Sequence, residues 1–183
     1  MRPVVVTAIL LLGVLMFMSD SAAGDLAQVC KTIYPVTPCK NKKLGEGWFQ
    51  MGSNRCVKAF YNTQHLGHSD AEMTCRKFPN GHLVSIHNDA EVNQVQCAMY
   101  KATTGKAHYW IGAFLIDDGD FYKHNYRFVW TDDSSFGYTN WAGGQPDNAR
   151  RREHCVEMNY WDWGLWNDAN CNENKPYVCA VNV

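Results

Sequence analysis

Eight cysteines constrain what this chain can fold into more than any other feature of its sequence. All of them lie beyond an apolar N-terminal stretch, and their number is even. In an exported protein such a set predicts that every cysteine is paired in a disulfide bond. The spacing alone leaves on the order of 100 possible pairings, so the connectivity needs further evidence.

The N-terminal stretch, residues 1–23, has the three parts of a secretory signal. Arg2 provides the charged start, residues 4–18 form an apolar run, and Ser21-Ala22-Ala23 supplies the small residues of a cleavage site. The alternative is a retained membrane anchor, but the apolar run is short for the roughly 20 residues that cross a bilayer. We therefore expect the mature chain to be secreted and extracellular.

The remainder, about 160 residues, is the size of one domain. We expect a signal peptide at 1–23, an N-terminal arm at 24–43 and one domain at 44–183. The arm contains Pro35 and Pro38 and shows no period that predicts a helix or strand. The net charge of −1 gives no bulk attraction to nucleic acid.

Short elements of both kinds are predicted within the domain. Two capping boxes, Ser69 with Glu72 and Asn88 with Glu91, predict helix starts. The predicted strands are Trp48–Met51 and Val57–Tyr61 as a hairpin, then Leu83–Ile86, Tyr109–Ile111, Phe128–Trp130, Val156–Met158 and Tyr177–Val181. The fold class is therefore α+β. The segment between Gly112 and Cys155 has little strand character, and such a long loop is usually functional.

Cys97 lies on the second predicted helix, nearly opposite its apolar stripe of Val92, Val95 and Met99. A cysteine on that side needs a partner outside the core. Cys30 on the arm is the local candidate, and a cysteine of another chain is the alternative. We favour Cys30 to Cys97 within one chain over a disulfide-linked dimer.

The segment from Trp141 to Asp168 concentrates oxygen ligands for a metal ion. Gln145, Asp147, Glu153, Asn167 and Asp168 offer three carboxylates and two amides, with no sulfur or imidazole. Hard oxygen donors of this kind suit calcium rather than zinc. Without a cation the carboxylates repel one another, so a bound ion stabilises the cluster. The alternative to a metal site is a solvated acidic loop, which is the usual interpretation of such residues taken singly.

These residues also resemble a known family, the C-type lectin domain. The resemblance covers roughly residues 44 to 183 and rests on Gln145-Pro146-Asp147, Glu153, Trp166-Asn167-Asp168, Trp110-Ile111-Gly112 and the cysteines Cys75, Cys155, Cys171 and Cys179. It implies the C-type lectin fold, with two helices flanking small antiparallel sheets and a long calcium-binding loop. It also implies the disulfides Cys75–Cys179 and Cys155–Cys171, and a hairpin disulfide Cys39–Cys56.

The resemblance further implies one calcium ion held by the five oxygen ligands and bridging to two adjacent sugar hydroxyls. Pro146 is cis in the family. The order Gln-Pro-Asp implies galactose-type sugars, whereas the reverse order, Glu-Pro-Asn, is associated with mannose. The resemblance does not extend to the acidic positions of the family's auxiliary calcium site, which hold Asn148 and His154 here.

Two features beside the tripeptide bear on the ligand. The aromatic residue that often follows the tripeptide in galactose binders is missing, and Trp161 or Trp163 is the candidate replacement. The alternative is that both rings cover the loop's own core. The run Arg150-Arg151-Arg152 makes sulfated or sialylated glycans and other anionic polymers candidate ligands. A solvated face and a site for a trypsin-like protease are the alternatives.

No motif of an enzyme is present: there is no G-x-S-x-G, no H-E-x-x-H and no glycine-rich phosphate loop. We therefore expect a secreted, calcium-dependent lectin of defence or agglutination, working as an oligomer or on clustered ligands. The alternative is a protein-binding or ice-binding relative that keeps the fold without sugar recognition. No N-x-S/T sequon is present, so N-glycosylation is not expected.

Overall fold

The C-terminal strand, β8 (Tyr177–Asn182), is the centre of the sheet. A computed structural model describes residues 25–117 and 126–183 of the chain. Within these residues β8 pairs antiparallel with two strands and parallel with β4 through Trp110 and Tyr177. The strand order is β1-β2-β8-β4-β6-β7, with β3 paired to β8 and β5 paired to β4. The predicted signal peptide, residues 1–23, lies outside the described residues.

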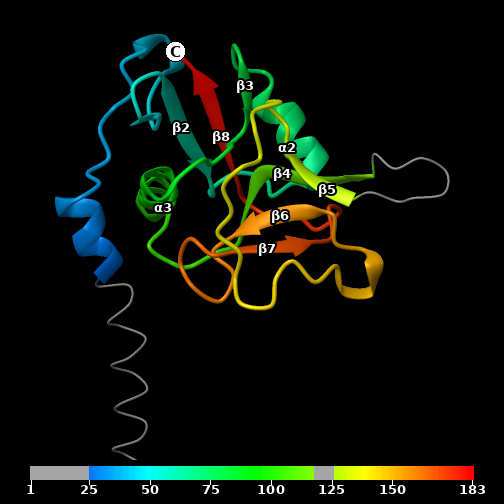
Figure 1. Cartoon of the computed structure of the whole chain (residues 1–183). Helices are drawn as coiled ribbons and strands as arrows, with labels where there is room; N and C mark the ends of the chain where they lie inside the picture. The colour runs from blue at the N-terminus through cyan, green and yellow to red at the C-terminus, as the bar shows by residue number, and fades with distance from the viewer. Residues whose placement is uncertain (1–24, 118–125) are drawn as a thin grey trace, which may run out of the picture.

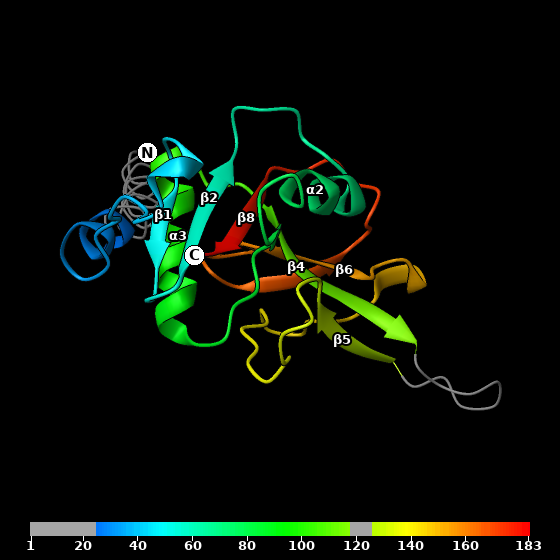
Figure 2. The same ribbon diagram turned by 90° about the horizontal axis from the view of Figure 1, so that it is seen from above.

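The other strands are β1 (Phe49–Met51), β2 (Arg55–Phe60), β3 (Gly81–Leu83), β4 (Tyr109–Asp117), β5 (Tyr126–Trp130), β6 (Cys155–Met158) and β7 (Trp166–Ala169). The helices of the domain are α2 (His68–Cys75) and α3 (Asp89–Ala102), with short 3-10 turns η1 (Lys42–Leu44) and η2 (Ala149–Arg151). Figures 1 and 2 show α2 and α3 on opposite sides of the β2–β8 pair. The α+β class and the β1–β2 hairpin are therefore confirmed.

The structure confirms the helix start predicted at Asn88 and the predicted apolar face of α3. The Asn88 side chain accepts a hydrogen bond from the Glu91 backbone amide at 3.0 Å. Val92, Val95 and Met99 are all buried in the core. The Glu91 carboxylate reaches the amide of His87 rather than that of Asn88, so only half of the predicted capping box forms.

The prediction that Ser69 caps α2 is wrong. The helix begins at His68 with Gly67 as its N-cap, and no side chain caps it. The backbone amide of His68 instead donates to the carbonyl of Cys171 at 2.9 Å. Glu72, the other half of the predicted box, accepts from the amide of Leu83 at 2.8 Å and pairs with His82. Tertiary partners therefore satisfy the groups that a local cap would have used.

The expectation that the arm has no regular structure is also wrong, because residues 25–32 form a helix. Two tertiary contacts hold it: Leu26 is buried, and Cys30 is bonded to Cys97 of α3. The packed helix covers Cys97, which is 1% exposed. Its order therefore comes from contacts that local sequence does not encode.

The long loop expected between Gly112 and Cys155 is shorter in the structure. β4 continues to Asp117 and pairs with β5 as an antiparallel ribbon. Gly112 lies at a bulge in β4, and a Cβ there would be 2.6 Å from the carbonyl oxygen of Leu83. Only glycine allows this close approach between backbones.

Two clusters of buried side chains form the core. One is centred on Trp130 and Trp166, whose rings meet edge to face at 5.6 Å. The other surrounds Trp110 and includes five of the cysteines among its buried members. The disulfides are Cys30–Cys97, Cys39–Cys56, Cys75–Cys179 and Cys155–Cys171, the four pairs that were expected. Among the described residues, no helix is both long and apolar enough to cross a membrane.

Candidate metal centre

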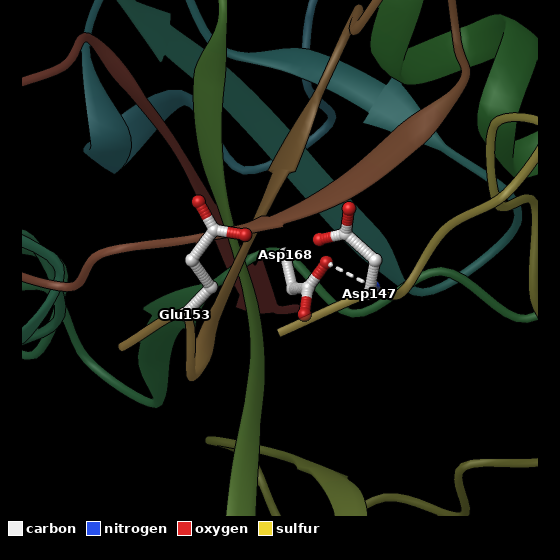
Figure 3. A group of neighbouring side chains, drawn as sticks. All are labelled: Asp147, Glu153 and Asp168. Carbon is white, nitrogen blue, oxygen red and sulfur yellow. Dashed lines mark hydrogen bonds between the residues drawn. The ribbon is translucent and has the colours of Figure 1, made fainter. Parts of the chain in front are cut away.

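Three carboxylates meet at the end of the β6–β7 pair (Figure 3). Asp147, Glu153 and Asp168 each offer one oxygen, and these three oxygens lie within 4.8 Å of one another. Asp168 comes from the strand β7, whereas Asp147 and Glu153 come from the two ends of the loop around η2. In the described chain this is the single group of three or more such acidic, imidazole or thiolate side chains.

Asp168 anchors the tripeptide loop to the sheet. Its carboxylate is 1% exposed and accepts hydrogen bonds from the backbone amides of Asp147 at 3.1 Å and Asn148 at 2.7 Å. The peptide bond between Gln145 and Pro146 is cis, as the family resemblance implied. A cis bond at proline is a placed feature of a turn. The two hydrogen bonds to Asp168 hold the backbone that carries Asp147.

A tight turn then carries the chain from Asp147 to Glu153. The backbone amide of Ala149 lies 3.1 Å from both Asp147 Oδ1 and Glu153 Oε2, and donates to both carboxylates. The amide of Glu153 donates back to Asn148 Oδ1 at 3.1 Å. The turn thus holds two carboxylates close together through shared backbone donors, which offsets part of their repulsion.

The electrostatics of the cluster are unfavourable without a cation. Burial raises the pKa of Glu153 above its usual value, and the negative charges of Asp168 and Asp147 raise it further. The hydrogen bond from Ala149 acts in the opposite direction but does not cancel these effects. Bringing a positive ion to the three oxygens would remove this penalty.

Gln145 provides a further oxygen that fits a cation. Its side-chain Oε1 is buried and has no hydrogen-bond partner in the described chain. A buried polar atom without a partner costs about 1–3 kcal/mol, so such atoms usually have a function or an absent partner. The donor set of three carboxylates and one amide oxygen contains hard ligands only. It fits calcium by its chemistry.

Asn167 was also expected in the ligand set, and the structure gives its side chain a different contact. Asn167 is 7% exposed and donates from Nδ2 to Glu157 Oε1 at 2.9 Å. Glu157 also pairs with Lys175 at 2.9 Å and His108 at 3.2 Å. Burial opposes ionisation of Glu157, yet its hydrogen bond from His108 and its pairing with Lys175 hold its pKa below the usual value.

Sequence reasoning missed Glu157 altogether. The signal was present, because Glu157 is the one charged residue within the buried strand β6. A buried charge needs a partner, and such residues commonly support a functional site.

The two candidate stacking residues differ in exposure. Trp161 is 65% exposed, and its ring edge lies 3.9 Å from the position a Cβ would take on Gly143, two residues before Gln145. Its other neighbour is Tyr160, stacked at 5.2 Å between ring centroids. Trp163 is partly buried and packs edge to face on Tyr100 at 6.1 Å. Of the pair, Trp161 is therefore the residue available to a ligand.

Proteins similar to this chain in sequence are named C-type lectins, and solved structures share its fold. The family model described as Lectin C-type domain matches residues 64–181. C-type lectin BfL-1 of Bungarus fasciatus is 38% identical over 126 residues, covering 68% of this chain and 75% of that protein. A C-type lectin galactose-binding isoform of Pseudechis porphyriacus is 36% identical with the same coverage. The structure of C-type lectin CEL-I from Cucumaria echinata superposes with a TM-score of 0.62 and 30% identity, covering 74% of this chain and 94% of that one.

Proposed function

We propose, since this chain belongs to the C-type lectin domain family, that it is a secreted, calcium-dependent lectin for galactose-type sugars. The lectins of this family bind carbohydrate and are not enzymes, in agreement with the absence of catalytic motifs in the sequence. The observation that carries the proposal is the cluster of Asp147, Glu153 and Asp168, together with the buried Gln145 Oε1 that has no hydrogen-bond partner in the described chain.

Calcium would be held by Gln145, Asp147, Glu153 and Asp168, with Asn167 as the fifth residue of the set. When bound, the ion supplies positive charge and open coordination positions that can accept sugar hydroxyls. The chain's own residues do the remaining work. Asp168 fixes the backbone of the tripeptide, and the Ala149 amide fixes the carboxylates of Asp147 and Glu153.

The preference for galactose-type sugars rests on the order of the tripeptide. The amide residue Gln145 precedes Pro146, and the carboxylate residue Asp147 follows it. A relative with 36% identity is a galactose-binding isoform by name. Trp161 offers an exposed aromatic face beside Gly143 for the apolar face of the sugar.

Calcium binding is tested by thermal unfolding in the ion and in EDTA. A ligand at a hundred times its Kd stabilises the folded state by about 2.7 kcal/mol. We expect such a rise in melting temperature for the natural chain and a much smaller one for Asp147→Asn. Asp162→Asn is the matched control, because Asp162 is exposed and its Oδ1 also accepts a backbone amide, that of Trp163 at 2.7 Å. An equal rise in Asp147→Asn would contradict the proposed site.

Sugar choice is tested by exchanging the residues that flank the cis proline. The double variant Gln145→Glu, Asp147→Asn keeps three carboxylates and two amides in the set but reverses the order of the two that flank the proline. We expect it to lose galactose binding and to gain mannose binding. Retention of galactose by the double variant would show that the order does not set the choice. A protein binder without sugar recognition would instead keep its partner in EDTA.

The cysteine framework supports the extracellular part of the proposal. All the cysteines of the described chain are in disulfides. Disulfides of this density persist in oxidising compartments. Agglutination or defence additionally requires more than one site, through oligomers or clustered ligands. Size-exclusion chromatography coupled to light scattering would measure the number of sites per particle.

A further inference from the structure

The loop of the candidate site carries three consecutive arginines, Arg150 to Arg152, in and after the turn η2. All three side chains are exposed, and in the described part of the chain none forms an ion pair. In Figure 1 the turn projects outward next to the end of β6. Three adjacent guanidinium groups repel one another, so the local structure gives them no stabilising role.

Hydrogen bonds fix the backbone of this turn. The amide of Arg151 donates to the carbonyl of Asn148 at 2.7 Å, and the Ala149 amide bonds to the site carboxylates. Arg150 and Arg151 have left-handed φ angles of 57° and 56°. This conformation is costly for any residue with a Cβ, and glycine or asparagine is the usual occupant. Conformations of this kind cluster at functional sites.

The charges of the arginines and the carboxylates balance until a cation arrives. Asp147, Glu153 and Asp168 carry three negative charges, and Arg150 to Arg152 carry three positive ones. A divalent ion taken up by the carboxylates leaves the loop with two positive charges. The loaded site therefore attracts anions, and the arginines provide paired N–H donors that match a sulfate or carboxylate.

We propose that Arg150, Arg151 and Arg152 form an anion subsite that selects acidic galactose-type glycans over neutral ones. The proposal rests on the function proposed above and names its substrate class. The anionic group lies on an atom not used by the ring hydroxyls that face the cation. A sulfate or a sialic acid attached at C6 of galactose meets this requirement, because it leaves the neighbouring ring hydroxyls free.

The test compares three immobilised glycans in calcium: N-acetyllactosamine, the same glycan with a 6-sulfate on galactose, and the same glycan with a 6-linked sialic acid. We expect the natural chain to bind one or both acidic glycans roughly fivefold to tenfold more tightly than the neutral one. The preference for acidic glycans should shrink in 1 M salt, because the Debye length there is about 3 Å and exposed charges are strongly screened. The sulfate and sialic acid surfaces show which anion the subsite accepts.

The variant Arg150→Gln, Arg151→Gln, Arg152→Gln should abolish the preference and leave neutral binding intact. The matched control is Lys40→Gln, Lys42→Gln, Lys43→Gln, which removes the same charge from exposed residues in and around η1. Figures 1 and 2 place η1 far from η2. The control variant should keep the preference.

Equal binding of neutral and acidic glycans by the natural chain would overturn the arginine subsite and leave the lectin proposal standing. A preference that survives in the glutamine variant, or is lost in the lysine control, would also overturn it. Failure to bind any of the three glycans in calcium would contradict both proposals. Binding of acidic glycans alone, unchanged by EDTA, would contradict the calcium-dependent function.

Discussion

Glu157 accepts a hydrogen bond from the side-chain amide of Asn167 at 2.9 Å across the β6–β7 pair. A carboxylate only accepts hydrogen bonds, so the NH2 group of Asn167 must face Glu157. The Oδ1 of Asn167 is thereby turned away from Glu157. Glu157 thus determines which end of the Asn167 amide is available beside Asp168.

Replacement of Glu157 by glutamine should weaken calcium binding without direct loss of a ligand. Glutamine can present either an oxygen or an NH2 group, so the orientation of Asn167 is no longer determined. We expect calcium affinity to fall about tenfold to a hundredfold, as for other groups that orient metal ligands. Isothermal titration with calcium measures this.

The control for that variant is Glu173→Gln, which removes another partner of Lys175 without touching Asn167. It should retain the natural calcium affinity. Glu157→Gln should also lower the free energy of unfolding in EDTA by about 1–3 kcal/mol, because Lys175 loses a buried partner. A loss of stability with unchanged calcium affinity would show that Glu157 has a structural role only.

Trp161 and Trp163 should separate sugar binding from stability. Trp161→Ala removes an exposed ring beside Gly143, so we expect galactose affinity to fall about twofold to tenfold with little change in melting temperature. Trp163→Ala removes a ring packed on Tyr100 and should lower the free energy of unfolding by about 1–3 kcal/mol. Galactose affinity and melting temperature are measured for both variants. A loss of affinity in Trp163→Ala with a loss of stability in Trp161→Ala would exchange the two roles.

The bond between Cys30 and Cys97 should stabilise the chain and keep it unlinked to other chains. Its sequence separation of 67 residues predicts a loss of at most about 4 kcal/mol in the double variant Cys30→Ala, Cys97→Ala. The Cys39–Cys56 bond lies inside this loop and reduces the effect. Urea unfolding measures the loss.

The single variant Cys97→Ala leaves Cys30 without a partner, so it should form disulfide-linked dimers on non-reducing gels. The natural chain should run as a monomer on the same gels. A linked dimer of the natural chain would contradict the pairing within one chain.

His68 should make the fold sensitive to acid. Burial lowers the pKa of His68, although its ring nitrogen lies 2.9 Å from the carbonyl oxygen of Ile111. The unfolded chain therefore binds a proton more readily than the folded chain, and stability falls as the pH drops below the usual histidine range near 6.5. His68→Gln should lose less stability between pH 7.5 and pH 5 than the natural chain, measured by melting temperature. His65→Gln, at an exposed site, should behave like the natural chain.

Local signals predicted those parts of the fold that depend on neighbours in sequence. The cap of α3 by Asn88 and the turn between β1 and β2 are of this kind. The helix of residues 25–32 and the start of α2 depend instead on Cys97 and on the Cys171 carbonyl, which are distant in sequence. The strand β7 was missed because its residues also form the proposed ligand motif, whose polar side chains do not alternate as in a surface strand.

The candidate site shows the same division. The sequence grouped Asp147, Glu153 and Asp168 by spacing, and the structure brings their oxygens together. The contact of Asn167 with Glu157 was not predictable, because it depends on the register between β6 and β7. Exposure separates Trp161 from Trp163, and it depends on the packing of α3 against the loop that carries them.

Retention on a galactose resin tests the central claim most directly, which is that a calcium ion at Asp147, Glu153 and Asp168 binds the sugar. The natural chain should bind the resin in calcium and elute in EDTA. Asp147→Asn should fail to bind, while Asp162→Asn should bind as the natural chain does. Retention in EDTA, or passage of the natural chain through the resin in calcium, would contradict the claim.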